Sequence, residues 1–131
     1  MSLAQTVLTL ESSLSPEAAA EKILAATVEE KFGVMGDIDI HATLNSKGFD
    51  FKHPVRVLEI CSPPHANEVL NNLLEISTAL PCRISVFQRD GKTWISTIKP
   101  TIMLGMFECP QLVEIAQEVE DAMVRIMQAG C

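Results

Sequence analysis

The sequence predicts a single α+β domain in which a mostly antiparallel sheet is packed by two long helices. Three observations support this prediction. Segments with an apolar residue at every second position alternate with segments whose apolar residues recur every three or four positions. An Asp-Gly pair joins two of the strand-like segments, as in a β-hairpin. The 131 residues, 47% of them hydrophobic, contain no linker or repeat, so one domain is expected over residues 1–131.

The first two expected elements are a strand over residues 5–12 and a helix over about 16–32. The loosely alternating segment QTVLTLES indicates the strand. Ser15 suits the N-cap, and Pro16 suits the first helical position, where its missing N–H costs nothing. Apolar residues then recur at helical spacing, and Gly33 is placed for a C-terminal cap.

Two further strands are expected on either side of a loop. The period is two from Gly36 to Leu44, which predicts a half-buried strand with a polar outer face. The aperiodic residues 45–54 are expected to form the loop. Residues 55–61 (VRVLEIC) are largely apolar on both faces, which predicts a strand inside the sheet.

A short helix and a hairpin follow. Apolar residues at helical spacing indicate a helix over about 64–75. Residues 82–89 and 92–99 read as strands, and Asp90-Gly91 between them is a strong two-residue turn signal.

The last expected element is an amphipathic helix that starts at Cys109-Pro110 and is closed by Gly130. The complete order is strand, helix, two strands, short helix, hairpin, helix. The exposed edge or the other face of such a sheet can pair with a second copy, so a homodimer is expected.

Composition and charge exclude several classes of function. Ten Lys and Arg against 17 Asp and Glu give a net charge of −7, which disfavours binding to nucleic acid. No apolar run approaches the roughly 20 residues that span a bilayer, so no membrane association is expected. The N-terminus lacks a secretory signal, and the four cysteines form no C-x-x-C pair. A cytoplasmic location with reduced thiols is therefore expected.

The first candidate site lies where the strand over 55–61 meets the short helix. The helix dipole would favour a thiolate at Cys61, making it a low-pKa nucleophile. Ser62 could cap the helix, and His65 in its first turn could reach the thiol or a ligand anion. A purely structural interpretation is equally compatible, with Cys61 as a small buried hydrophobe.

The second candidate segment leads from the short helix into the hairpin. Arg83 could clamp a carboxylate or phosphate, or it could be a solvated residue on an edge strand. Cys82 shares a strand face with Ile84, which favours packing over reactivity. Because Cys61 and Cys82 flank the same short helix, they can meet, and His65 would complete a soft metal set. The spacing fits no standard zinc pattern, so no metal is expected.

Two carboxylates and an imidazole form a third candidate. Asp37, Asp39 and His41 alternate along the polar face of their strand, where they could bind a cation or perform acid–base chemistry. Alternation alone also explains them as a solvated face.

Three segments in order resemble a known family, domain of unknown function 302. They are GDIDIHATL at 36–44, VLEICSPPHA at 57–66 and LPCR at 80–83, and the resemblance spans about residues 6–129. It implies a homodimer and a compact fold similar to one half of the TATA-binding protein, with the order strand, helix, four strands, helix. The likeness implies no DNA binding, because a fold does not fix a function.

The family motif can be carried over position by position, although it brings no activity with it. One departure is Ser62, where the family usually has Asn, which puts a side-chain amide contact there in doubt. The motif residues present in this chain are Asp39, Thr43, Cys61, Pro63, Ala66, Leu80, Pro81 and Cys82.

The leading functional hypothesis is a homodimeric binding module for a small anionic or thiol-reactive ligand near Cys61. One alternative is sulfur transfer or thiol redox chemistry through Cys61, with Cys82 as the resolving thiol. Another is a structural or interaction protein that uses the sheet edge and the Met-rich last helix. No cofactor is indicated, and the sequence does not decide whether the protein is an enzyme. The expected ligand-binding residues are Asp39, Cys61, Ser62, Pro63, His65, Pro81, Cys82 and Arg83.

Overall fold

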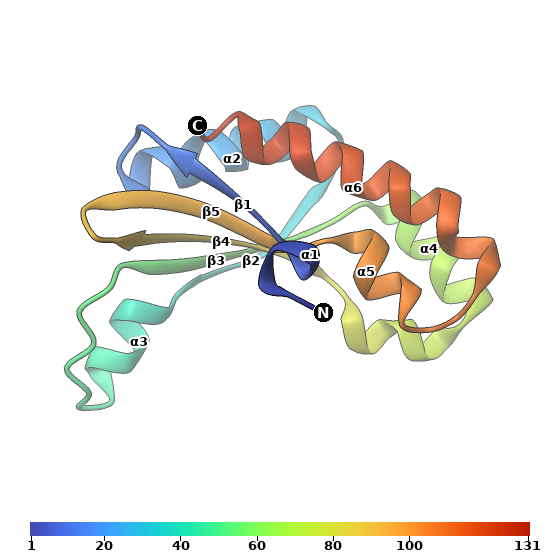
Figure 1. Cartoon of the computed structure of the whole chain (residues 1–131), viewed down its shortest axis with the longest axis horizontal. Coiled ribbons are helices and arrows are strands. Elements are labelled where there is room, and N and C mark those ends of the chain that lie inside the picture. The colour runs from blue at the N-terminus through green and yellow to red at the C-terminus, as the bar shows by residue number, and fades with distance from the viewer.

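The computed structural model describes all 131 residues and shows a five-stranded antiparallel sheet with two long helices on one face (Figure 1). The sheet order is β1-β5-β4-β3-β2, which confirms the predicted α+β fold. The strands are β1 (Val7–Ser12), β2 (Gly33–Asp39), β3 (Val55–Cys61), β4 (Cys82–Arg89) and β5 (Lys92–Ile98). The α-helices are α1 (Leu3–Thr6), α2 (Pro16–Glu29), α3 (Ile40–Ser46), α4 (Pro63–Asn72), α5 (Pro100–Gly105) and α6 (Val113–Gln128), and 3₁₀ turns occupy Leu74–Ala79 and Pro110–Leu112.

The core lies between the sheet and the helices α2 and α6. It is built from one face of the inner strands and the apolar stripes of the two helices. Burying one large apolar side chain contributes roughly 1.5–3 kcal/mol. Met123 and Met127 are fully buried, as their place in the predicted stripe of the last helix requires. Other fully buried side chains are Ile23, Leu58, Ile60, Ile76, Ile84, Val86, Ile95, Leu112 and Ile126.

The predicted strand over 36–44 is wrong in its second half. The strand β2 begins earlier, at Gly33, and ends at Asp39, and α3 replaces the rest of the expected strand and the first two residues of the expected loop. The carboxylate of Asp39 accepts a hydrogen bond from the backbone N–H of Ala42 at 2.8 Å, so Asp39 is the N-cap of α3. An N-cap contact of this kind favours a helix over continued alternation.

Two other boundaries differ from expectation. The helix α2 stops at Glu29, and the chain reverses at Lys31 with φ of 63°, so Gly33 is the first residue of β2 and not a cap. The strand β5 ends at Ile98, and Pro100 opens the helix α5, which the sequence did not predict. Pro suits this position because the first helical N–H has no partner within the helix.

The hairpin prediction is confirmed. Asp90 and Gly91 link β4 to β5 with φ of 53° and 74°, the pair of left-handed residues that a type I′ turn requires. The strand β3 lies inside the sheet, between β2 and β4, as predicted. The strand β4 is the central strand, so the expectation that Arg83 lies on an edge strand is wrong.

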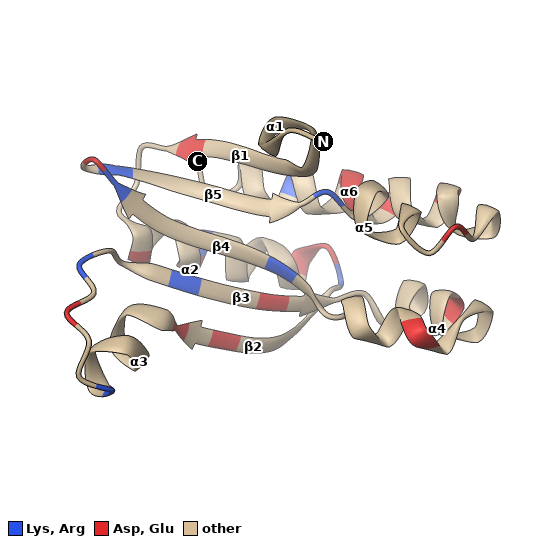
Figure 2. Ribbon diagram, turned by 60° about the horizontal axis from the view of Figure 1, so that its bottom comes forward, with Lys and Arg blue, Asp and Glu red and all other residues tan.

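The sheet face turned away from α2 and α6 carries no long helix (Figure 2). We call it the open face. Its apolar members include Val55, Val57, Phe87 and Trp94, and the Arg89 guanidinium lies 5.5 Å from the ring centre of Phe87 and 5.6 Å from that of Trp94. None of the helices is both long and apolar enough to cross a lipid bilayer.

Candidate functional site

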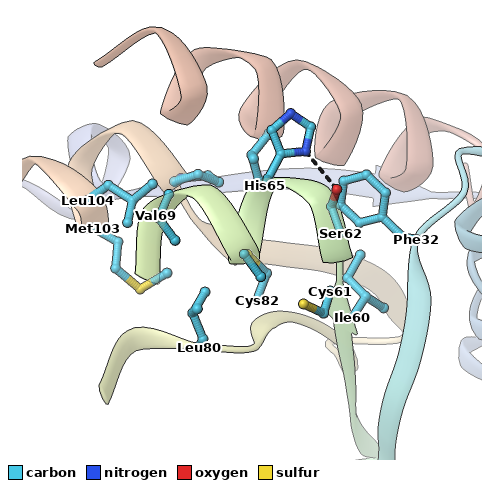
Figure 3. A pocket seen from close by; sticks show the side chains of 13 residues that line it. Phe32, Ile60, Cys61, Ser62, His65, Val69, Leu80, Cys82, Met103 and Leu104 are labelled. Carbon is cyan, nitrogen blue, oxygen red and sulfur yellow. Dashed lines mark hydrogen bonds between the residues drawn. The ribbon is translucent and has the colours of Figure 1, made fainter. Parts of the chain in front are cut away.

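A small pocket lies beneath α4, at the end of the sheet where β3 stops and β4 begins (Figure 3). The strand register places Ile60 opposite Cys82, so Cys61 is the next residue along from the partner of Cys82. Both cysteines, which flank the short helix in the sequence, line this one pocket. Its lining residues are Phe32, Ile60, Cys61, Ser62, His65, Ala66, Val69, Leu80, Cys82, Pro100, Met103, Leu104 and Val119.

The pocket is small and largely apolar. Ten of its 13 lining residues are hydrophobic, and its free volume is about 30 Å³. Pockets that hold drug-sized organic ligands measure about 300–1,000 Å³. This one has room only for an ion or a very small molecule.

Burial sets the chemistry of the two thiols. It raises the pKa of Cys61, and it raises the pKa of Cys82 to about 11, with a smaller contribution from the nearby charge of Cys61. The expectation of a low-pKa thiolate at Cys61 is therefore wrong. Desolvation disfavours the anion, and the prolines at positions 63 and 64 leave the first turn of α4 without two of its N–H donors. Both cysteines are free thiols.

Ser62 and His65 form a hydrogen-bonded chain with α6. Ser62 is the N-cap residue of α4, yet its side chain makes no capping bond, contrary to expectation. Its Oγ lies 2.6 Å from Nδ1 of His65, and Nε2 of His65 lies 3.0 Å from Oε2 of Glu118 (Figure 3 shows the first contact). The imidazole therefore links α4 to α6 and holds the roof of the pocket in place.

Three further residues predicted to bind ligand lie beside the pocket without lining it. Arg83 follows Cys82 on β4 and so points to the opposite sheet face, where its Nε pairs with the Glu59 carboxylate at 3.3 Å. Pro63 and Pro81 adjoin lining residues, and the Leu80–Pro81 peptide bond is cis. Among the predicted residues, only Cys61, Ser62, His65 and Cys82 line the pocket.

Asp39 lies far from this pocket. In the pairing of β2 with β3, Asp39 stands opposite Arg56, whereas Gly33 at the other end of β2 stands opposite Cys61. Six residues of strand separate the two ends, about 20 Å. The carboxylate of Asp39 is engaged as the cap of α3.

The acid–base set considered on this strand is also dispersed. Asp37 makes a bidentate pair with Arg56, whose Nε and Nη2 donate to its carboxylate at 2.7 and 2.6 Å. Nδ1 of His41 contacts the backbone carbonyl of His53 at 2.9 Å. No group of three or more His, Cys, Asp or Glu side chains is arranged to hold a metal ion anywhere in the chain.

Several site residues escaped the sequence analysis because they come from distant segments. Met103 belongs to α5, a helix that was not predicted, and Glu118 lies on the polar side of α6, 53 residues from His65. No local pattern marks either one. The Ser-x-x-His spacing of Ser62 and His65 was a usable signal, since positions three apart on a helix face each other.

Comparison with known proteins gives a family and no activity. Residues 8–130 match the family described as Domain of unknown function DUF302. A crystal structure of an uncharacterized conserved protein of this family from Bacillus stearothermophilus is 32% identical in sequence and superposes with a TM-score of 0.92, over 96% of this chain and 98% of that one. No curated protein matches the chain. Since the match spans almost every residue and the folds agree, the chain belongs to the DUF302 family.

Proposed function

We propose that this protein is a homodimeric binding module whose pocket beneath α4 takes a small thiol-reactive or thiophilic ligand at Cys61. The observation that carries the proposal is that two free thiols, Cys61 and Cys82, line one small apolar pocket. Sulfur is the only reactive element that the apolar part of this pocket offers. A ligand that enters it must be very small or soft enough to bond to sulfur.

The pocket favours this ligand over an anion. Its lining contains no Lys or Arg, and Arg83 is turned to Glu59 on the other side of the sheet. The first two helical residues of α4 are Pro63 and Pro64, which have no N–H to offer an anion. We therefore propose a thiol-reactive or thiophilic ligand and no longer an anionic one.

Sulfur transfer or thiol redox chemistry is the second candidate, because both thiols reach the same pocket. It ranks lower, since a nucleophilic cysteine acts as its thiolate and burial raises the pKa of both Cys61 and Cys82.

Self-association is supported by the open face. It presents Val57, Phe87 and Trp94 without a covering helix, and it carries both signs of charge in Glu59 and Arg83, which lets the face be complementary to a second copy of itself. The edge strand β2 is less suited, because a register shift interrupts it and charged residues follow (Asp37 and Asp39). The Met-rich helix is not available to a partner, since Met123 and Met127 are fully buried.

The binding proposal is tested with two thiol reagents of the same chemistry and different size. Methyl methanethiosulfonate is small and uncharged; it transfers a CH₃S group to a thiol and releases methanesulfinic acid. Its trimethylammonioethyl analogue is larger and cationic. We expect the ratio of the small-reagent rate to the large-reagent rate to be on the order of 10-fold higher at Cys61 than at the exposed Cys131, because only the small reagent enters the pocket.

A matched pair of variants completes this test. Ala66→Leu places bulk in the pocket wall and is expected to slow labelling of Cys61 by the small reagent. Ala25→Leu on an exposed turn of α2 adds the same bulk elsewhere and is expected to leave labelling unchanged. Equal size selectivity at Cys61 and Cys131 would refute the pocket proposal.

A further inference from the structure

We propose that the pocket beneath α4 binds a single monovalent soft metal ion, Cu(I), through the sulfurs of Cys61 and Cys82. The thioether of Met103, which also lines the pocket, is a third sulfur donor. This inference rests on the proposed function, because it names the ligand of the same pocket.

The donor atoms are the first argument. Three sulfur-bearing side chains line the pocket, from the end of β3 (Cys61), the start of β4 (Cys82) and α5 (Met103). Figure 3 shows all three in the space below α4. Thiolate and thioether ligands select Cu(I) among the common metal ions, whereas carboxylates and carbonyls suit harder ions.

The number of ligands that the pocket offers is small. A structural zinc site needs four ligands, and no group of three or more His, Cys, Asp or Glu side chains is arranged to hold a metal ion. The ring nitrogens of His65 are both engaged, one with Ser62 and one with Glu118. Two thiolates remain, with one thioether, which is a soft set of low coordination number that suits Cu(I).

The two cysteines lie at the ends of neighbouring strands. The β3–β4 register sets Ile60 opposite Cys82, so Cys61 is one residue away from the position directly across the ladder. Here, where β3 ends and β4 begins, both cysteines line the same pocket.

The pocket is small and its lining is largely apolar. The free volume of about 30 Å³ accommodates one ion and excludes most organic molecules. Apolar side chains, which include Val69, Leu80 and Leu104, line the space around the sulfurs. A hydrophobic shell around a metal controls solvent access and its redox potential.

Charge and atoms balance in the binding step. Cu(I) displaces the protons of the two thiols and forms two Cu–S bonds, so one Cu⁺ enters as two H⁺ leave. The copper is neither oxidised nor reduced. The bound unit, one metal cation and two thiolates, carries a net charge of −1.

The experiment is an anaerobic titration with Cu(I) in competition with the chromophoric chelator bicinchoninate. We expect the wild-type chain to bind one Cu(I) tightly. Cys61→Ser and Cys82→Ser should each weaken binding by more than the 10–100-fold that loss of an outer-shell partner costs. The matched control carries Cys109→Ser and Cys131→Ser, which removes the other two cysteines, and it is expected to bind as the wild type does.

Three further readouts keep the result decisive. X-ray absorption of the loaded wild-type protein should show sulfur as the only metal neighbour. Far-ultraviolet circular dichroism checks that each variant is folded, and Cys61→Ser, at a half-buried position, serves if Cys82→Ser does not fold. Met103→Leu is expected to weaken binding less than either Cys variant, because its thioether is an uncharged ligand.

The outcomes separate this inference from the proposed function. Cu(I) binding that survives in Cys61→Ser, or that is lost in the Cys109 and Cys131 control, overturns the metal site. A chain that binds no Cu(I) yet labels Cys61 selectively with the small reagent refutes the metal site and retains the pocket proposal. A chain that neither binds Cu(I) nor labels Cys61 selectively overturns both the metal site and the pocket proposal.

Discussion

Cys82 and Cys61 differ from the other two cysteines in their surroundings. Burial raises the pKa of both thiols, and at Cys82 the pKa reaches about 11. Each is therefore a neutral thiol near pH 7 in the folded protein, and its proton leaves only at alkaline pH or when a metal or electrophile replaces it.

The first prediction at this scale concerns alkylation with iodoacetamide. Since the thiolate is the reacting form, labelling of Cys82 in the folded chain should reach half of its maximal rate near pH 11, where its pKa lies. In urea-denatured protein the same residue should titrate with the usual thiol pKa of ~8.5. Mass spectrometry of the digested chain reports each cysteine separately, and a folded-state midpoint near the denatured value would contradict the prediction.

The second prediction concerns the bidentate pair of Asp37 with Arg56, which joins β2 to β3. The guanidinium hydrogen bonds hold the pKa of Asp37 below its usual value, so this carboxylate stabilises the fold above pH ~4 and the stabilisation disappears as the pH falls through the lowered pKa. Asp37→Asn should cost about 1 kcal/mol of unfolding free energy at pH 7, a figure reduced for its partial exposure, and almost nothing in strong acid.

Urea unfolding across this pH range measures the Asp37 effect. The matched control is Asp50→Asn, which removes the partner of Lys52 in a fully exposed pair and should leave stability unchanged. A loss at Asp37→Asn that persists unchanged in acid would argue for packing and against the ion pair.

At the scale of elements, the end of α6 depends on close approach. Gly130 follows the helix and does not adopt a left-handed φ. Glycine is therefore needed here for close packing and not for a turn. A Cβ there would lie 2.8 Å from Cγ1 of Ile23 and 3.0 Å from Cδ1 of Ile95, both in the buried core. Ser12 also donates to the carbonyl of Gly130, which ties β1 to this chain end.

Gly130→Ala is therefore expected to lower the free energy of unfolding by about 1–3 kcal/mol through overpacking. Gly105→Ala is the control, because nothing lies within 4 Å of the added Cβ at the end of α5. That change should be neutral or stabilise by up to ~1 kcal/mol, since it restricts the unfolded chain. Thermal or urea unfolding decides the matter, and equal effects at the two glycines would contradict the packing argument.

At the scale of the whole molecule, self-association through the open face and self-association through the β2 edge can be distinguished by mutation. Val57→Glu places a charge in the middle of the open face, between Ile38 of β2 and Ser85 of β4. It should convert the proposed dimer to a monomer in sedimentation equilibrium without altering the circular dichroism, because an unpaired charge in the proposed apolar interface is costly.

The control for this surface is Met35→Glu on the exposed β2 edge, where the residue is 67% exposed. It should leave the dimer intact. Dissociation by the Met35 change and not by the Val57 change would place the contact at the edge, and a wild-type monomer at high concentration would refute self-association.

The reach of sequence reasoning also depends on scale. The hairpin at Asp90-Gly91 and the strand β3 were predictable, because turn chemistry and apolar patterning are local. The helix α3 was missed because one capping contact by Asp39 outweighed a period-two pattern. The pocket was half predictable: Cys61 and Cys82 adjoin one predicted helix, whereas Met103 and Glu118 arrive through tertiary packing that leaves no local signal.

The sheet order has a consequence for how the chain assembles. The strand β1 comes first in the sequence, but its only neighbour is β5, so Val7 pairs with Ile98 across most of the chain. The strands β2 to β5 can pair sequentially, each with the next, while β1 waits. Until β5 forms, the apolar segment of β1 has no docking position. During synthesis this segment therefore stays unpaired until the last strand has formed, which leaves it open to chaperones or to the β5 edge of a neighbouring chain.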